Sequence, residues 1–134
     1  MSRPKLDHIA IAVRSLESAE IYKALGFAVD HVETVESQGV KTAFLSVGDS
    51  NIELLEPISS DSTVARYIEK YGEGMHHLCF RVENIEEHLK KLESEGYRLI
   101  NPQPVPGAHG CRVAFLHPST ANGVLIELSE KVKP

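Results

Sequence analysis

Two histidines and two glutamates occupy matching places in this sequence, and their side chains could bind a metal ion. His8 lies in DHIAIAV and His77 in HHLCFRV. Glu53 lies in NIELLEP and Glu127 in VLIELSE. Imidazole nitrogens and carboxylate oxygens are common ligands of divalent metal ions. A glutamate among apolar neighbours is also costly to bury unless it is paired, protonated or bound to a cation. The four residues are therefore candidate metal ligands.

Each of these residues has a simpler explanation when it is considered alone. A single histidine in a strand is usually a hydrogen-bonded core or surface residue, and a single glutamate there usually faces water. Two such pairs repeated in register favour a metal site over this structural role.

The repetition extends over most of the chain. Residues 7–27 read DHIAIAVRSLESAEIYKALGF and residues 76–97 read HHLCFRVENIEEHLKKLESEGY, so each stretch has a histidine, an alternating strand, a helix, a glycine and an aromatic residue. Residues 40–57 and 111–130 share an AFL triplet, a polar turn and an apolar strand that carries glutamate. The chain is therefore predicted to contain a duplicated module of about 70 residues.

Local signals predict the same order of elements, β-α-β-β-β, in each module. Ser15 and Asn84 suit helix N-caps, the latter with Glu87 three residues on. Gly26 and Gly96 suit the C-terminal ends of the same helices. The stretch SDSTVARYIEKYGEG has apolar residues at helical spacing and predicts an amphipathic helix that joins the modules. We expect module one at about 5–58, the linker helix at about 61–72 and module two at about 75–130, within a single domain that spans 1–134.

The first strand of each module should have two different faces, because alternate side chains of a strand point to opposite sides. His8 shares its face with two alanines, and bulky residues take the other face. His77 shares its face with Cys79 and Arg81, again opposite bulky residues. The bulky faces should pack on the helices, so the other faces line a concavity into which the candidate ligands point. His76 should then face away from that site and have a structural role.

Composition and charge limit the function classes. Of the 134 residues, 42% are apolar and 25% are charged, which is typical of a globular protein. The net charge of −5 argues against general nucleic-acid binding. The sequence has no N-terminal signal pattern and no run of about 20 apolar residues, so we predict no membrane span and a cytoplasmic location. Cys79 and Cys111 are expected to be free thiols.

The paired modules, with histidine in the first strand and glutamate in the last, resemble the vicinal oxygen chelate superfamily. This superfamily includes glyoxalase I, extradiol dioxygenases, bleomycin-resistance proteins and methylmalonyl-CoA epimerases. The chain is most similar to the epimerase family over DHIAIAV, QGVKTAFL, IELLEP, GEGMHHLCF, PGAHG, and FLHP followed by GVLIEL. The resemblance implies an α+β fold in which two repeated βαβββ modules form an open, eight-stranded, cup-shaped barrel with flanking helices. It also implies a homodimer.

The same resemblance implies a metal ion and an acyl-CoA substrate. The ion is expected to be Co2+, with Zn2+, Mn2+, Ni2+ and Mg2+ as alternatives, held by His8, Glu53, His77 and Glu127. The implied enzyme is a metal-dependent isomerase that interconverts the two epimers of methylmalonyl-CoA. It would remove and return the proton on the carbon alpha to the thioester, through a metal-stabilised enolate.

Epimerisation requires proton exchange on both faces of the carbon, hence two bases or one mobile base. Glu127 resembles the family's carboxylate that serves as both ligand and base. Some epimerases have a glutamate where this chain has Thr42, and a hydroxyl is a poor base near neutral pH. Glu53 is therefore the predicted second base, acting after it leaves the metal, and a water molecule is the alternative.

Coenzyme A carries phosphates, which basic side chains could contact. Arg3, Lys5, Lys41 and Arg112 are candidate partners of its phosphates, although scattered basic residues are usually only solubilising. The Pro- and Gly-rich stretch NPQPVPGAHG, residues 101–110, predicts an irregular loop, and its part from Gly107 to Gly110 is expected to help shape the substrate pocket.

Three other functions are compatible with parts of the same sequence. A glyoxalase I-like lactoylglutathione lyase, or another enzyme of the superfamily, would use similar ligands with a different pocket. An Fe(II) extradiol dioxygenase would need two histidines and one carboxylate with open positions, so a fourth ligand at Glu53 argues against it. A binding or resistance protein would keep the cup without the metal, and the full ligand set argues against that.

Overall fold

The computed structural model describes residues 2–132, and over this range it contains eight strands and three α-helices. The chain divides into two compact units. The first unit runs from His8 to His76. The second unit combines the chain up to Asp7 with the chain from His77 onward. No helix within residues 2–132 is long and apolar enough to cross a membrane.

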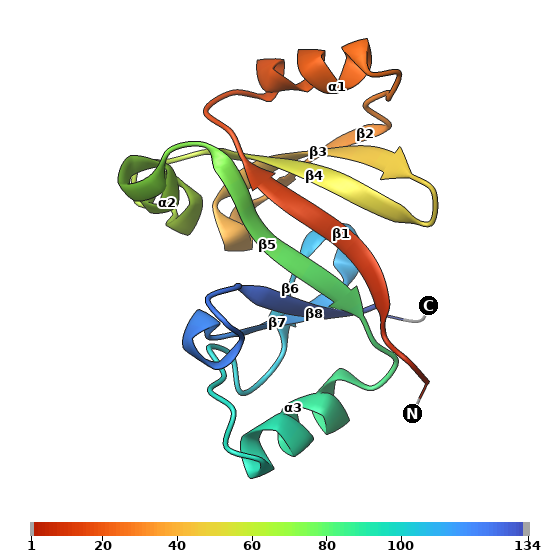
Figure 1. The fold of residues 1–134 in the computed structure, drawn as a ribbon, viewed down its shortest axis with the longest axis vertical. Coiled ribbons are helices and arrows are strands. Elements are labelled where there is room, and N and C mark those ends of the chain that lie inside the picture. The colour runs from red at the N-terminus through yellow and green to blue at the C-terminus, as the bar shows by residue number, and fades with distance from the viewer. Residues whose placement is uncertain (1, 133–134) are drawn as a thin grey trace. The chain divides into compact units, whose positions relative to one another are not determined.

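The strands of the first unit follow the order β2-β3-β4-β1 (Figure 1). β2 is antiparallel to β3 and β3 to β4, whereas β1 is parallel to β4 from His8 to Ala12. A short 3-10 helix leads into α1, and α2 follows β4. The bounds are β1 Lys5–Ala12, α1 Glu20–Ala24, β2 His31–Val35, β3 Val40–Val47, β4 Ser50–Pro57 and α2 Thr63–Tyr71.

The core of the first unit lies between the sheet and α1. Ile11 and Val13, from the predicted bulky face of the first strand, pack in one cluster with Leu16 and with Tyr22 of α1. This arrangement confirms that the bulky face of the first strand packs against the helix. Ala10 and Ala12 are fully buried, and their side chains alternate with the bulky ones along β1.

The second unit repeats this arrangement, with the strand order β5-β8-β7-β6. β5 is parallel to β8, and the remaining neighbours are antiparallel. The helix α3 lies across one face of the sheet (Figure 1), where Phe80 and Val82 pack with its residues Ile85 and Leu89. The bounds are β5 Gly74–Arg81, α3 Ile85–Ser94, β6 Val105–Pro106, β7 Arg112–Leu116 and β8 Ile126–Glu130. The predicted α+β class with two βαβββ modules is confirmed.

The four predicted capping residues lie at the ends of their helices, and three of them have the geometry expected of a cap. The Ser15 hydroxyl accepts a hydrogen bond from the Glu17 N–H at 3.2 Å, as an N-cap should. Gly26 and Gly96 adopt positive φ angles of 105° and 87° at the helix C-termini. Asn84 is different, because its side chain makes no capping hydrogen bond.

A glutamate from the last strand takes the place of the predicted Asn84 cap. The Ile85 N–H at the start of α3 donates to Glu130 Oε2 at 3.2 Å. In the first unit, the Leu16 N–H donates in the same way to Glu56 Oε1 at 2.9 Å. A carboxylate is favoured at this end because the N-terminus of a helix carries partial positive charge. Both modules therefore anchor the start of the helix to the last strand.

The helix α2 lies in the stretch where the sequence predicts an amphipathic linker. Ser62 caps its N-terminus by accepting from the Ala65 N–H at 3.0 Å. The apolar spacing buries Val64 and Ile68. Tyr67 donates its hydroxyl hydrogen to the Met75 carbonyl at 2.7 Å, which ties the helix to the start of β5.

Candidate metal-ligand pairs

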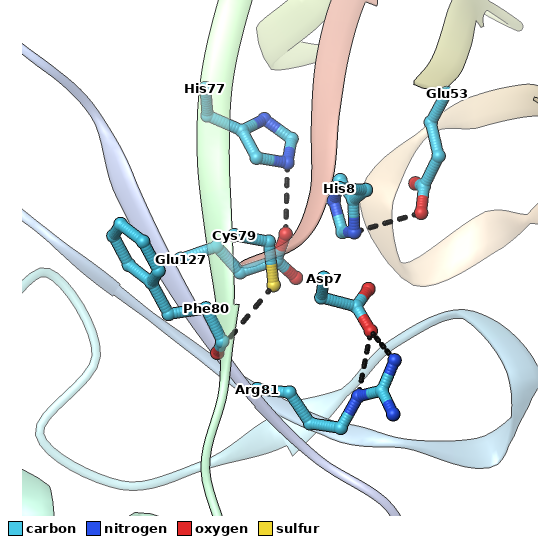
Figure 2. Close-up of polar contacts among 8 residues, drawn as sticks. All are labelled: Asp7, His8, Glu53, His77, Cys79, Phe80, Arg81 and Glu127. Carbon is cyan, nitrogen blue, oxygen red and sulfur yellow. Dashed lines mark hydrogen bonds and ion pairs between the residues drawn. The ribbon is translucent and has the colours of Figure 1, made fainter. Parts of the chain in front are cut away.

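The first unit holds His8 and Glu53 in direct contact. His8 Nδ1 lies 2.9 Å from Glu53 Oε2 (Figure 2). Glu53 is carried by β4 between Ile52 and Leu54, which belong to the helix-side core, so its side chain must point to the other face. Both members of the pair are buried, with 6% of His8 and 7% of Glu53 exposed.

The second unit holds His77 and Glu127 in a similar contact, which is made by Nε2 of the imidazole instead of Nδ1. His77 Nε2 lies 2.8 Å from Glu127 Oε1 (Figure 2), and both residues are 7% exposed. Glu127 lies beside Cys79, two residues after His77, just as Glu53 lies beside Ala10, two residues after His8. Each pair therefore joins two parallel strands at the same diagonal offset. The equivalence that the sequence repeat predicts is confirmed for each pair by itself.

The donor atoms of each pair fit a divalent metal ion. Metal–nitrogen and metal–oxygen bonds are about 2.0 to 2.2 Å long, so neighbouring ligand atoms of one ion lie about 3 Å apart. The nitrogen–oxygen distances of 2.9 and 2.8 Å match that separation. Without an ion, the same contact is a hydrogen bond or, with a protonated imidazole, an ion pair. Imidazole and carboxylate together suit Co2+, Zn2+ and similar ions.

A phenylalanine stands directly across from the glutamate of each pair. Phe44 of β3 is the antiparallel partner of Glu53, and Phe115 of β7 is the antiparallel partner of Glu127. Both belong to the AFL triplets that helped to define the repeat. The sequence analysis assigned them no role, although their shared place in the two AFL triplets, in the strand before each glutamate, was the signal that could have identified them.

Thr42 lies on the same face as Phe44, two residues earlier in β3, and is 2% exposed. Its antiparallel partner in β4 is Leu55, two residues after Glu53. The face of this sheet that carries Glu53 therefore also carries a buried hydroxyl.

His76 contacts the linker helix. Its ring lies 5.0 Å from the Tyr67 ring at an angle of 76°. This edge-to-face contact is a packing role, as predicted.

Two arginines have carboxylate partners that the sequence analysis did not identify. Arg81 donates to Asp7 Oδ1 from Nε at 3.1 Å and from Nη2 at 3.0 Å (Figure 2). Arg112, a candidate contact of coenzyme A, binds the carboxylates of Glu130 and Glu86. Its hydrogen bonds raise the pKa of the Arg112 guanidinium, and the bond to Glu130 contributes more than the bond to Glu86.

The loop after β6 is a tight, ordered turn. The Gly107 N–H donates to the Cys111 carbonyl at 2.9 Å, and the Cys111 N–H donates to the Ala108 carbonyl at 3.0 Å. A Cβ on Gly107 would lie 2.6 Å from Val113 Cγ1, so only glycine fits there. His109 stands at the tip with φ of 56°. The irregular loop is confirmed, and its part in a substrate pocket stays a prediction.

Comparison with protein families gives a match over residues 7–115 to the Glyoxalase/Bleomycin resistance protein/Dioxygenase superfamily. The chain belongs to this superfamily. A relative within it, the mitochondrial methylmalonyl-CoA epimerase of Dictyostelium discoideum, is 43% identical over 95% of this chain and 78% of its own length. Within the superfamily, the chain therefore belongs to the methylmalonyl-CoA epimerase family.

Two solved structures of superfamily members extend the likeness to the fold. A methylmalonyl-CoA epimerase in complex with methylmalonyl-CoA and NH4+ has a TM-score of 0.90 and 37% identity, covering 98% of this chain and 96% of its own. A variant of the Streptomyces coelicolor methylmalonyl-CoA epimerase, in complex with 2-nitronate-propionyl-CoA, has a TM-score of 0.91 and 37% identity, covering 99% and 100%. The predicted vicinal oxygen chelate fold and the family resemblance are confirmed.

Proposed function

We propose that this protein is a metal-dependent methylmalonyl-CoA epimerase. The observation that carries the proposal is the buried His–Glu pair found at the same diagonal offset in each module. The similar epimerase of known structure in complex with methylmalonyl-CoA supports the choice of substrate. The wider class, an isomerase that acts on a small acyl-CoA, follows from the same relatives.

The two pairs are proposed to hold one divalent ion, with His8, Glu53, His77 and Glu127 as its ligands and the chain 1–134 acting as one domain. Two carboxylates and two neutral imidazoles leave such a site formally neutral, which lowers the cost of burying the carboxylates. When bound, the ion would supply positive charge that stabilises negative charge on the thioester oxygen. Co2+ is the expected ion, and Zn2+, Mn2+, Ni2+ and Mg2+ are alternatives.

Glu127 and Glu53 are proposed to move the proton. Glu127 accepts the proton from the carbon between the thioester and the carboxylate, so that the C–H bond breaks and its electron pair stays on the acyl group. Glu53, released from the metal and protonated, then donates a proton to the opposite face of that carbon. The two carboxylates exchange roles when the other epimer reacts, and no proton is consumed. Thr42 cannot replace either carboxylate, because a hydroxyl is too weak a base near neutral pH to accept the proton.

A homodimer and a cytoplasmic location are also proposed. A homodimer follows from the resemblance to superfamily relatives. A cytoplasmic location stays a prediction from the sequence, and the relative from Dictyostelium discoideum is mitochondrial.

The decisive experiment follows deuterium exchange. Metal-stripped and Co2+-restored protein would each be incubated with one epimer of methylmalonyl-CoA in deuterated water. We expect deuterium gain at the acidic carbon, together with formation of the other epimer, only after Co2+ is restored. The absence of exchange in both samples would contradict the proposal. Lactoylglutathione formation from the glutathione hemithioacetal would instead support the lyase.

A further inference from the structure

We infer that Phe115 is a positioning residue that fixes the orientation of the His77 imidazole beside Glu127. The inference rests on the proposed function, because it gives Phe115 a role in the proposed metal site. The centroids of the Phe115 and His77 rings lie 5.4 Å apart, and the two planes meet at 85°. Aromatic rings favour this edge-to-face arrangement because the positive edge of one ring faces the negative face of the other.

The strand register places Phe115 beside both members of the pair. Phe115 in β7 is the antiparallel partner of Glu127 in β8, so the two side chains lie on the same face of the sheet. Ala114 and Leu116, on either side of Phe115, belong to the core cluster under α3. Phe115 must therefore point to the opposite face, where His77 contacts Glu127.

The imidazole of His77 is thus held from two directions. Glu127 Oε1 contacts its Nε2 at 2.8 Å, and the Phe115 ring limits rotation of the imidazole about the Cβ–Cγ bond. The torsion about such a bond is broad unless neighbouring groups restrict it. If the ring were removed, the imidazole would have to be ordered again whenever metal binds. Loss of a group that orients a metal ligand typically weakens metal binding by about 10- to 100-fold.

Module one provides a matched control. Phe44 has the same place in the AFL triplet and the same register position opposite Glu53. Its ring stacks on His31, with the centroids 5.7 Å apart and an angle of 25°. His31 is exposed and is not one of the proposed ligands. Substitution of Phe44 therefore removes an equivalent ring while the contact between Phe115 and His77 is kept.

The test measures Co2+ binding to the metal-stripped full chain, by calorimetry and by the visible absorption of bound Co2+. We expect Phe115→Leu to weaken binding about tenfold and to alter the absorption spectrum of bound Co2+. Phe115→Tyr keeps the ring and should bind Co2+ within about twofold of the wild type. Phe44→Leu should change the affinity by less than about threefold. If Phe115→Leu does not fold, Phe115→Met serves the same test.

The outcomes separate this inference from the function on which it rests. If the wild type binds Co2+ and Phe115→Leu binds it as tightly as Phe44→Leu does, the positioning role is overturned while the metal site stands. If the wild type binds no Co2+, the proposed metal site and this inference both fail.

Discussion

The two modules place the same pair of side chains in the same register, but they surround the pairs differently. In each module, the glutamate lies beside a residue of the neighbouring parallel strand, and the histidine stands two residues before that residue. Phe115 contacts the histidine of the second pair, whereas the equivalent Phe44 stacks on the exposed His31. The difference teaches that strand register suffices to bring the ligand atoms together, while neighbouring side chains decide how firmly each ligand is held.

The anchoring of the two helices differs in a similar way. Glu56 accepts from the first helical N–H of its module, and Glu130 does the same in the other. Glu130 also binds Arg112, which has a second carboxylate partner in Glu86. The shared contact belongs to the repeat, and the additional ion pairs belong to one copy.

The largest effect is expected from removing a histidine of either pair. His8→Ala and His77→Ala should each lower bound Co2+ and epimerase activity by about 100-fold or more, because each removes one of the four proposed ligands. Bound metal would be measured by elemental analysis and activity by deuterium exchange. His76→Ala is the control for His77→Ala, since His76 contacts Tyr67 and should mainly alter stability. If only one of the two alanine variants loses metal, the pairs are not functionally equivalent.

The second comparison concerns the two glutamates. Glu127→Gln should lower kcat by about 100- to 10,000-fold, because an amide cannot accept the proton. Glu53→Gln should also lower kcat, since it removes the second base, while the amide oxygen can still bind metal. Turnover and metal content would be measured together. Full turnover of Glu53→Gln with normal metal content would show that Glu53 is not the second base.

A third comparison uses two glycines in equivalent turns, one before β3 and the other before β7. Gly39 and Gly110 have nearly equal φ angles of 68° and 70°, a conformation that costs other residues about 1 kcal/mol. An added Cβ would lie 2.8 Å from Ser62 Cβ at Gly39 but meets nothing within 4 Å at Gly110. Gly39→Ala should therefore lower the free energy of unfolding by about 2 to 3 kcal/mol and Gly110→Ala by about 1.

Urea denaturation would measure both alanine variants. Equal losses would mean that Ser62 moves aside at little cost, and the two turns would then be equivalent.

The smallest effect is expected at the helix anchors. Glu56→Gln removes a negative charge from a helix N-terminus and should lower the free energy of unfolding by about 0.5 to 1 kcal/mol. Glu130→Gln should lower it further, because the charge that binds Arg112 is lost as well. Urea denaturation at low and high salt would separate the two contributions, since salt screens the ion pair. Equal losses at low salt would show that the ion pair adds nothing to stability.

Much of the fold was predictable because its signals are local or repeated. Ser15 caps the start of a helix, and Gly26 and Gly96 follow the ends of two helices, as predicted, since a cap depends on only a few neighbouring residues. Asn84 lies at the N-cap position of α3 as predicted, but the carboxylate that accepts from the start of the helix comes from Glu130, which is distant in the sequence. A local sequence pattern shows where a helix begins. It does not show which residue, distant in the sequence, will accept a hydrogen bond from the first N–H groups of that helix.

The sequence by itself determined the repeat, the order of the elements and the identity of the four candidate ligands. It could do so because strand and helix periods, and the matching positions of two modules, are written along one chain. The tertiary structure alone decided the His–Glu contacts, the ring of Phe115 against His77 and the partner of Arg81. Each of these joins residues from different strands, so it depends on pairing and register, which exist only once the sheets have formed.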